Sequence, residues 1–353
     1  MRIACEPGGS GDARVVTHRT LAGLGIVLVA LLSWASGVRG APVKQEDPRA
    51  ERLTFSTGRS VTCLASAPLR EPQPRVEIAI IVIHGLGRDD ENAFAGIIAA
   101  ARASGKGPVT LVLAPKFKAA DDDPGADEHF WSNDGWPSGD LSQDAKDQAG
   151  RLSSFAVVDR LYGELADATR FPALRRVVLV GHSAGGQLVN RYVAVGRLGE
   201  GAGTPNGRLE HRFVIANPSS YLYLDERRPV SGSDRFEPPR QAPPGYNAWR
   251  HGLERRNAYA GRLSVDEIRG NVFGRTAYYL VGTADIKRDG SLSTSPPSML
   301  QGDNRYDRWE KFRRYVELFP EWRARAVFAE VLGVGHSSAQ MFDSRAARKA
   351  MFE

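Results

Sequence analysis

From Val76 onward, short continuous apolar runs alternate with amphipathic segments of helical periodicity. Ile78–Ile83 (IAIIVI) and Val177–Val180 (VVLV) are rich in β-branched residues and show no polar alternation. Such runs are typical of strands buried on both faces, as in parallel sheets covered by helices. Further strands are predicted at Val109–Leu113, Phe213–Ala216, Thr276–Val281 and Ala326–Leu332. The pattern predicts one α/β domain over residues 76–353, with a mainly parallel sheet and helices on both faces.

The predicted helices carry recognisable signals at their N-termini. Asp89 and Asp90 can cap a helix that includes Ala93–Ala103, and Ser153 and Ser154 precede an apolar stripe that reaches Leu165. Ser264 and Glu267 have the spacing of a capping box. Two further helices are predicted over Tyr306–Leu318 and Ser338–Phe352.

The first 40 residues have the layout of a secretory signal peptide. An apolar run, Leu21–Leu32, follows an arginine-containing segment and leads into small and polar residues, with a plausible cleavage point after Gly40. The alternative is an uncleaved membrane anchor over Leu21–Val38. Both interpretations place the rest of the chain outside the cytoplasm. It is expected to be periplasmic or secreted, without stable membrane contact if the signal is removed.

Residues 41–75 are predicted to form a linker followed by a hairpin. Two β-like runs, Glu51–Phe55 and Ser60–Ala65, flank a turn at Thr57-Gly58. Cys63 lies within the second run, among mostly apolar residues. We therefore expect a buried, unreactive thiol at this position and not a nucleophile.

Composition excludes several classes of protein. The 47 basic residues exceed the 41 acidic residues only slightly, and no basic stripe indicates a nucleic-acid site. Two cysteines, Cys5 and Cys63, rule out a disulfide scaffold and a Cys-rich zinc site. An acidic cluster between Asp121 and Glu128 does not have the spacing of a calcium-binding EF-hand loop. No metal site is predicted.

Gly181-His182-Ser183-Ala184-Gly185 is the motif that points to chemistry. It matches Gly-x-Ser-x-Gly, follows the strand-like RVVLV directly and opens a helix-like segment. A serine on so tight a strand-to-helix turn projects its hydroxyl away from the sheet. Ser183 is therefore the candidate nucleophile.

A serine hydroxyl needs a base that removes its proton. His336 follows the last apolar strand, at the sheet edge where ligands collect in folds of this class. His182 is excluded as the base because adjacent positions on a sharp turn point apart, and His129, His211 and His251 are expected to be solvated. His336 is the candidate base.

A carboxylate usually holds such a base in one tautomer. Asp285 lies a few residues beyond the predicted strand Thr276–Val281, at the same sheet edge. Asp289 and Asp303 are the alternatives and lie farther from the strand end. The chain order Ser183, Asp285, His336 is that of an α/β-hydrolase triad.

The tetrahedral intermediate of such a reaction needs two amide donors. The backbone N–H of Ala184, directly after the nucleophile, is one candidate. The second is the N–H of Leu86, because His84-Gly85-Leu86 forms the turn after the first buried strand. His84 is then expected to have a scaffolding role.

These motifs together resemble those of serine hydrolases of the α/β-hydrolase fold, in the esterase and lipase branch, over about Ile78–Phe352. The resemblance rests on His84-Gly85-Leu86, the Ser183 turn, Asp285 and His336. It implies an acyl-enzyme on Ser183 that is hydrolysed by water activated by His336. It also implies that no metal or organic cofactor is needed.

Two long irregular segments, at about Lys116–Gln148 and at residues 219–274, adjoin the predicted site. Residues 219–274 are rich in Pro, Arg and Gly and are interpreted as a lid-like insertion, with a plain surface insertion as the alternative. Trp131 and Trp136 in the loop at about Lys116–Gln148, and Tyr221 and Tyr223 in residues 219–274, are interpreted as packing residues, with substrate contact as the alternative.

The sequence thus predicts an exported serine hydrolase that cleaves a small or lipid-like carboxylic ester. An amidase or peptidase with the same triad is the nearest alternative. A binding protein that uses this fold without catalysis is a third possibility, which the complete set of Ser183, Asp285 and His336 disfavours.

Overall fold

The computed structural model describes residues 48–147, 149–198 and 209–353. The predicted signal peptide or anchor, residues 1–40, and the start of the linker at 41–47 lie outside the described residues. Across the described ranges, no helix has the length and apolar character needed to span a bilayer.

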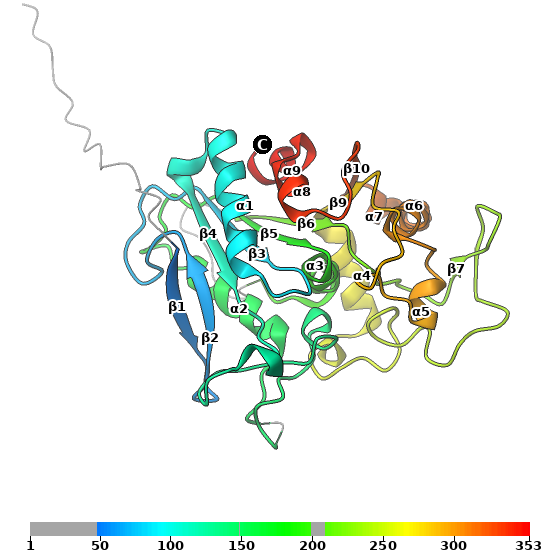
Figure 1. The fold of residues 1–353 in the computed structure, drawn as a ribbon, viewed down its shortest axis with the longest axis horizontal. Coiled ribbons are helices and arrows are strands. Elements are labelled where there is room, and N and C mark those ends of the chain that lie inside the picture. The colour runs from blue at the N-terminus through cyan, green and yellow to red at the C-terminus, as the bar shows by residue number, and fades with distance from the viewer. Residues whose placement is uncertain (1–47, 148, 199–208) are drawn as a thin grey trace, which may run out of the picture. The chain divides into compact units, whose positions relative to one another are not determined.

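An eight-stranded sheet forms the centre of the described chain (Figure 1). Its spatial order is β1-β2-β4-β3-β5-β6-β9-β10. All neighbours from β4 to β10 pair in parallel, whereas β2 is antiparallel to both β1 and β4. The strands are β1 (Arg49–Thr54), β2 (Ser60–Ala65), β3 (Ile78–Ile83), β4 (Thr110–Pro115), β5 (Arg176–His182), β6 (Glu210–Ala216), β9 (Thr276–Gly282) and β10 (Ala326–Val331). The predicted mainly parallel sheet is confirmed.

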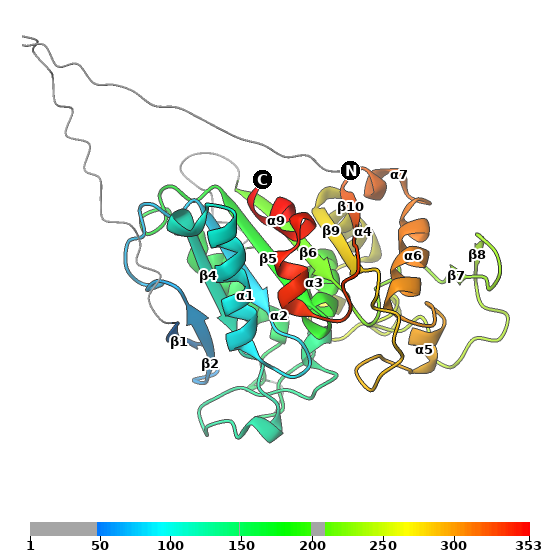
Figure 2. The same ribbon diagram turned by 45° about the horizontal axis from the view of Figure 1, so that its top comes forward.

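The predicted hairpin is present as β1 and β2, which pair from Arg49 with Ala65 to Thr54 with Ser60. It lies at one edge of the sheet, and β10 forms the other edge (Figure 2). A separate small ribbon, β7 (Arg228–Pro229) with β8 (Phe236–Glu237), lies within the predicted insertion.

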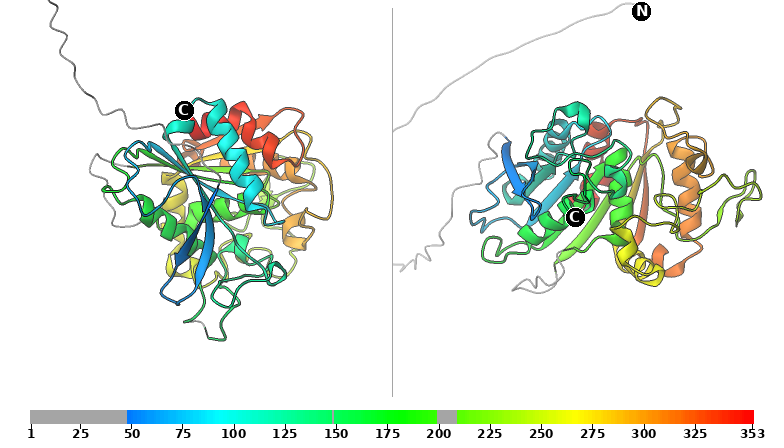
Figure 3. Two further views of the ribbon diagram at one scale, coloured as in Figure 1. Left: turned by 60° about the vertical axis from the view of Figure 1, so that its left-hand side comes forward. Right: turned by 90° about the horizontal axis from the view of Figure 1, so that it is seen from below.

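Helices cover both faces of the sheet because side chains alternate along each strand. On β3, Ile80 and Val82 pack toward one layer, whereas Ala79 and Ile81 pack toward the other. The first layer contains α1 (Asp90–Ala103), α8 (Ser338–Asp343) and α9 (Arg345–Phe352). The second contains α2 (Ser154–Leu165), α3 (Ala184–Val195), α4 (Val265–Gly274) and α6 (Arg305–Val316). Figure 3 shows the two layers on opposite sides of the strands.

The remaining elements are short. They are α5 (Pro296–Met299), α7 (Pro320–Arg323) and the 3-10 turns η1 (Gly107–Val109), η2 (Ala120–Asp122), η3 (Trp136–Ser138) and η4 (Ala260–Arg262). The capping box predicted at Ser264 and Glu267 begins α4.

The C-terminal helix predicted over Ser338–Phe352 is instead two helices. Ser344 has extended backbone angles between α8 and α9. Its hydroxyl donates to the carbonyl of Met341 at 2.7 Å and accepts from the amide of Ala347 at 3.1 Å. Ser344 thus ends one helix and caps the next. Serine side chains can bond nearby backbone groups in this way, in competition with the hydrogen bonds of a continuous helix.

Cys63 is completely buried in β2, and burial raises the pKa of its thiol far above the ordinary range. We predict that the folded full-length protein with Cys5→Ser does not react with Ellman's reagent at pH 8. Reaction of one thiol per chain should appear only after unfolding in guanidinium chloride. Rapid stoichiometric reaction of the folded protein would contradict the buried position.

Candidate active site

Four neighbouring strands carry the residues of the candidate site at their carboxyl ends. Ser183 follows β5, Asn217 follows β6, Asp285 follows β9 and His336 follows β10. These strands are consecutive in the sheet, so Ser183 and His336, which are 153 positions apart in sequence, meet at the carboxyl ends of the strands. This is the edge at which open α/β sheets bind their ligands.

Main-chain hydrogen bonds tie these strand ends together. The amide of Ser183 donates to Ala216 at 2.9 Å, and the amide of Asn217 donates to Leu280 at 3.0 Å. The loop after β9 is joined to the loop after β10 by a 2.9 Å bond from the amide of Ala284 to the carbonyl of Val334. The side chains of the site therefore project from a rigid frame.

Ser183 has a strained backbone, with φ 59° and ψ −120°. An L-residue occupies this region only where its surroundings impose it. The strand-to-helix turn is tight enough to require flanking glycines: a Cβ on Gly185 would collide with the carbonyl oxygens of Ile83 and His84, and one on Gly181 with the backbone of Gly185. The predicted nucleophile position is thus built by close packing of the turn on itself and against the end of β3.

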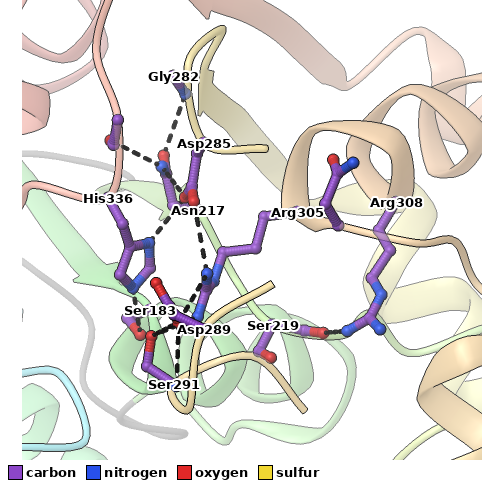
Figure 4. Close-up of polar contacts among 12 residues, drawn as sticks. Ser183, Asn217, Ser219, Gly282, Asp285, Asp289, Ser291, Arg305, Arg308 and His336 are labelled. Carbon is purple, nitrogen blue, oxygen red and sulfur yellow. Dashed lines mark hydrogen bonds and ion pairs between the residues drawn. The ribbon is translucent and has the colours of Figure 1, made fainter. Parts of the chain in front are cut away.

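His336 connects the serine to the aspartate (Figure 4). Its Nε2 lies 2.9 Å from Ser183 Oγ, and its Nδ1 lies 2.7 Å from Asp285 Oδ2. Because a carboxylate only accepts, Nδ1 carries the proton and Nε2 is left to accept from the serine hydroxyl. The structure brings all three predicted triad residues together and places Asp285, not Asp289 or Asp303, against the histidine.

The carboxylate of Asp285 is 1% exposed and is held from several directions. Asn217 Nδ2 donates to its Oδ2 at 2.5 Å, and the Arg305 guanidinium lies 3.4 Å from its Oδ1 (Figure 4). Burial alone would raise the pKa of Asp285, but the hydrogen bond and charge of His336, together with Arg305 and Asn217, lower it below the ordinary value. Asp285 therefore stays ionised.

Leu86 and Ala184, the predicted amide donors, line the same cavity as Ser183. Ala184 is the first residue of α3, so its N–H has no acceptor within the helix. The turn that contains Leu86 is held by Arg88, which donates to the carbonyl of Leu86 at 3.2 Å and to the side chains of Asp122 and Asn133.

His84 has a structural position, as predicted. Its Nε2 accepts from the amide of Phe117 at 3.0 Å, so its Nδ1 carries the proton and donates to the carbonyl of Gly85 at 2.8 Å. Burial lowers its pKa to about 4. The imidazole is neutral and fixes the turn before Leu86.

His182 contacts the site in a way that sequence reasoning did not anticipate. The centroid of its ring lies 4.5 Å from that of His336. Burial and the neighbouring His336 charge lower the pKa of His182 to about 3. A second positive charge beside the base is thereby avoided.

Two other histidines differ from expectation. His129 and His251 were expected to be solvated but are 1% and 6% exposed. His129 bonds Asp144 at 3.0 Å and Thr57 at 2.8 Å, which ties the hairpin turn to the loop after β4. His251 bonds Ser298 at 3.0 Å. Neither environment could be inferred from a polar local sequence.

A cavity of about 210 Å³ adjoins Ser183. The segment 219–274, interpreted as a lid-like insertion, contributes part of its wall; movement of this segment stays a prediction. The turn after β3, the loop after β4, the first residues of α3 and the loop after β9 supply the rest. Polar wall residues include Gln187, Ser219, Ser220, Arg250, His251 and Ser293.

The aromatic residues for which substrate contact was the alternative do not line this cavity. Trp131, Trp136, Tyr221 and Tyr223 are each fully buried in the core. Trp136 stacks on Phe117, and the rings of Tyr221 and Tyr223 pack against α6. The burial agrees with the packing interpretation and not with substrate contact, because these side chains form the apolar core that anchors the loops.

The described ranges contain no group of three or more His, Cys, Asp or Glu side chains arranged to hold a metal ion. The acidic residues between Asp121 and Glu128 instead pair with cations on neighbouring segments. Asp121 and Asp122 contact Arg88, Asp127 contacts Arg52, and Glu128 contacts Lys118.

No protein-family model and no curated protein matches the sequence. Solved structures do match. Poly(aspartic acid) hydrolase-1 from Sphingomonas sp. KT-1 is 22% identical, with a TM-score of 0.59 over 87% of this chain and 98% of that chain. LpqC, a poly(3-hydroxybutyrate) depolymerase from Bordetella parapertussis, is 19% identical, with a TM-score of 0.58 over 87% and 91%. With the strand order above, these likenesses establish the α/β-hydrolase fold.

The buried neutral histidines make stability depend on pH. An unfolded histidine binds a proton near pH 6.5, whereas His84 and His182 stay neutral in the fold down to about pH 4 and pH 3. The unfolded state therefore binds more protons in this window, and the free energy of unfolding falls as pH decreases from about 6.5. Each histidine contributes up to about 1.4 kcal/mol per pH unit.

We predict that His182→Met reduces this slope by about one proton, or about 1.4 kcal/mol per pH unit, between about pH 6 and pH 4. The measurement is urea unfolding at a series of pH values, with circular dichroism at pH 7 to verify the fold. An unchanged slope would mean that His182 titrates normally in the folded protein.

Proposed function

We propose that this chain is an exported serine hydrolase that cleaves carboxylic esters through an acyl-enzyme on Ser183. The observation that carries the proposal is the continuous hydrogen-bonded chain from Ser183 through His336 to Asp285, beside a cavity that also contains Leu86 and Ala184. Nucleophile, base, orienting acid and candidate anion donors are then all present at one sheet edge.

In the first half of the reaction, Ser183 Oγ attacks the ester carbonyl while His336 Nε2 takes the hydroxyl proton. The amides of Leu86 and Ala184 stabilise the oxyanion that forms. Asp285 remains ionised and stabilises the imidazolium. The carbon–oxygen bond to the alcohol then breaks, and the proton on Nε2 passes to the leaving oxygen.

In the second half, water replaces the alcohol. His336 Nε2 removes a proton from the water, whose oxygen attacks the acyl carbon of the acyl-enzyme. Collapse of the second tetrahedral intermediate breaks the bond to Ser183 Oγ, which recovers its proton from His336. The products are an alcohol and a carboxylic acid.

Amide cleavage by the same residues is the second candidate. Of the two similar structures, one is named for poly(3-hydroxybutyrate), a polyester, and the other for poly(aspartic acid), a polyamide. Amide hydrolysis requires the same transfer of a proton from His336 to the leaving group. Matched ester and anilide substrates separate the two activities.

We predict that the wild-type protein is labelled by a fluorophosphonate probe and hydrolyses p-nitrophenyl acetate, whereas Ser183→Ala does neither above background. The loss in kcat should be about 10⁴-fold or more, because the nucleophile is removed. Equal turnover by Ser183→Ala, or absence of labelling and turnover in the wild type, would refute the proposal and favour a binding protein.

We predict that Asp285→Asn lowers kcat by about 10⁴-fold with a small change in KM, because an amide can hold the histidine in the wrong tautomer. The measurement is steady-state kinetics on the same ester. Asp303→Asn is the matched control, since this alternative aspartate does not contact His336, and it should leave kcat unchanged. A large loss in Asp303→Asn with none in Asp285→Asn would reverse the assignment.

Export rests on the N-terminal sequence alone. We predict that expression in a bacterial host gives a chain that begins at Ala41 and is released from the periplasm. N-terminal sequencing of that fraction is the measurement. A full-length chain retained with membranes would support the anchored alternative.

A further inference from the structure

The wall of the cavity beside Ser183 is backed by arginines. Arg191, Arg228, Arg305 and Arg308 are each less than 2% exposed, and each donates a hydrogen bond to a residue that lines the cavity. The bonds run from Arg191 to Ser220 Oγ at 3.0 Å, from Arg228 to the carbonyl of His251 at 3.0 Å, from Arg305 to Ser291 Oγ at 2.9 Å, and from Arg308 to the carbonyl of Ser293 at 2.9 Å. Figure 4 shows Arg305 and Arg308 on α6, with Arg305 directed toward Asp285 and Ser291 and Arg308 directed toward Ser219.

Most of these positive charges are not neutralised by a carboxylate. Arg305 pairs with Asp285 and Asp289. Within the described ranges, Arg191, Arg228 and Arg308 have no ion pair and bond only carbonyls, hydroxyls, side-chain amides and a thioether. A buried charge without a counter-ion is costly. These cations therefore leave a positive potential in the cavity that an anion would lower.

The cavity also presents hydrogen-bond donors. Gln187 Oε1 accepts from Arg191 at 3.2 Å and from Ser220 at 2.9 Å. Because arginine can only donate, the amide oxygen must point toward it, which leaves the Nε2 group as the donor available to the cavity. Arg250 also lines the cavity. It donates to the carbonyl of Asp134 at 2.8 Å and pairs with the Asp134 carboxylate at 3.2 Å, an exposed pair that water and salt weaken.

The position of His336 indicates which part of the substrate enters this cavity. His336 lines a separate hollow, together with His182 and Phe342, and does not line the cavity beside Ser183. The leaving alcohol must lie next to His336 Nε2 to receive its proton. The acyl part is then the part directed into the cavity that contains Leu86, Ala184 and the arginine-backed wall.

We infer that this cavity selects an ester whose acyl group carries a carboxylate, such as the half-ester of a short dicarboxylic acid. The inference rests on the proposed function, since it names the substrate class of the same site. The pKa of His251, which lines the cavity, reflects the same positive charges. Burial, followed by the charges of Arg191 and Arg250, lowers the pKa of His251. The imidazole is therefore neutral and needs no counter-ion when the cavity holds no anion.

The test compares two substrates of nearly equal size. Monoethyl succinate carries a carboxylate where ethyl levulinate carries a methyl ketone, and both release ethanol. With the full-length chain at pH 7.5, we expect kcat/KM to be at least about tenfold higher for monoethyl succinate, because the positive potential of the cavity attracts a carboxylate more strongly than a neutral ketone oxygen. Equal values, or a preference for the ketone, would overturn the inference.

An arginine substitution tests the source of the preference. Arg250→Gln should lower the ratio of the two kcat/KM values by about threefold or more. Arg175→Gln is the matched control. This exposed arginine precedes the amino end of β5, whereas Ser183 follows the carboxyl end, so the substitution should leave the ratio unchanged. An equal effect of the two substitutions, or none from Arg250→Gln, would contradict recognition at the cavity rim.

Binding to Ser183→Ala separates this inference from the proposed function. Calorimetry should give tighter binding of monoethyl succinate than of ethyl levulinate, whether or not the wild type turns either over. If neutral esters are hydrolysed in a Ser183-dependent manner but the succinate is not preferred in turnover or binding, only the inference fails. If no ester is hydrolysed and no probe label appears, the proposed function fails, and calorimetry alone decides on anion selection: tighter succinate binding supports it, and equal or absent binding overturns it.

Discussion

The buried carboxylate of Asp285 is the charge on which the arrangement of this sheet edge depends. Removing a carboxylate from water costs several kcal/mol unless positive and hydrogen-bonding groups replace the solvent. Here the replacements come from separate elements: His336 beyond β10, Asn217 beyond β6 and Arg305 at the start of α6. Together they lower the pKa of Asp285, so the carboxylate stays ionised. Assembly of the candidate site and satisfaction of this buried charge are therefore one physical event.

The arginine-backed cavity has a different electrostatic character. Around Asp285 positive and negative groups balance, whereas Arg191, Arg228 and Arg308 bond neutral groups only among the described residues. The balanced region lies next to His336, the proposed base, which would gain and lose a proton during turnover. The unbalanced region lies where the acyl group is proposed to bind. Electrostatics thus divides the space around Ser183 into a part suited to proton transfer and a part suited to recognition.

Sequence was sufficient for features that depend on local signals. The continuous apolar run Ile78–Ile83 predicted a buried parallel strand, and Gly181–Gly185 marked a turn in which a serine is strained. Asn217, Arg305 and the surroundings of His182 were missed, because their roles depend on contacts between segments distant in sequence. The Asn-Pro pair directly after β6 was the one local sign of a special position. For the aromatic residues in loops, the sequence left packing and substrate contact open, since composition does not separate loop anchors from ligand contacts.

The buried arginines also have a consequence for how this protein can change. Because unpaired internal cations oppose folding, a neutral, well-packed residue at Arg191 or Arg308 would be a route to a more heat-resistant chain. The same replacement would remove the field that distinguishes one acyl group from another. Thermal resistance and the proposed selectivity therefore compete at these positions, and a chain adapted to high temperature through them would discriminate less between acyl groups.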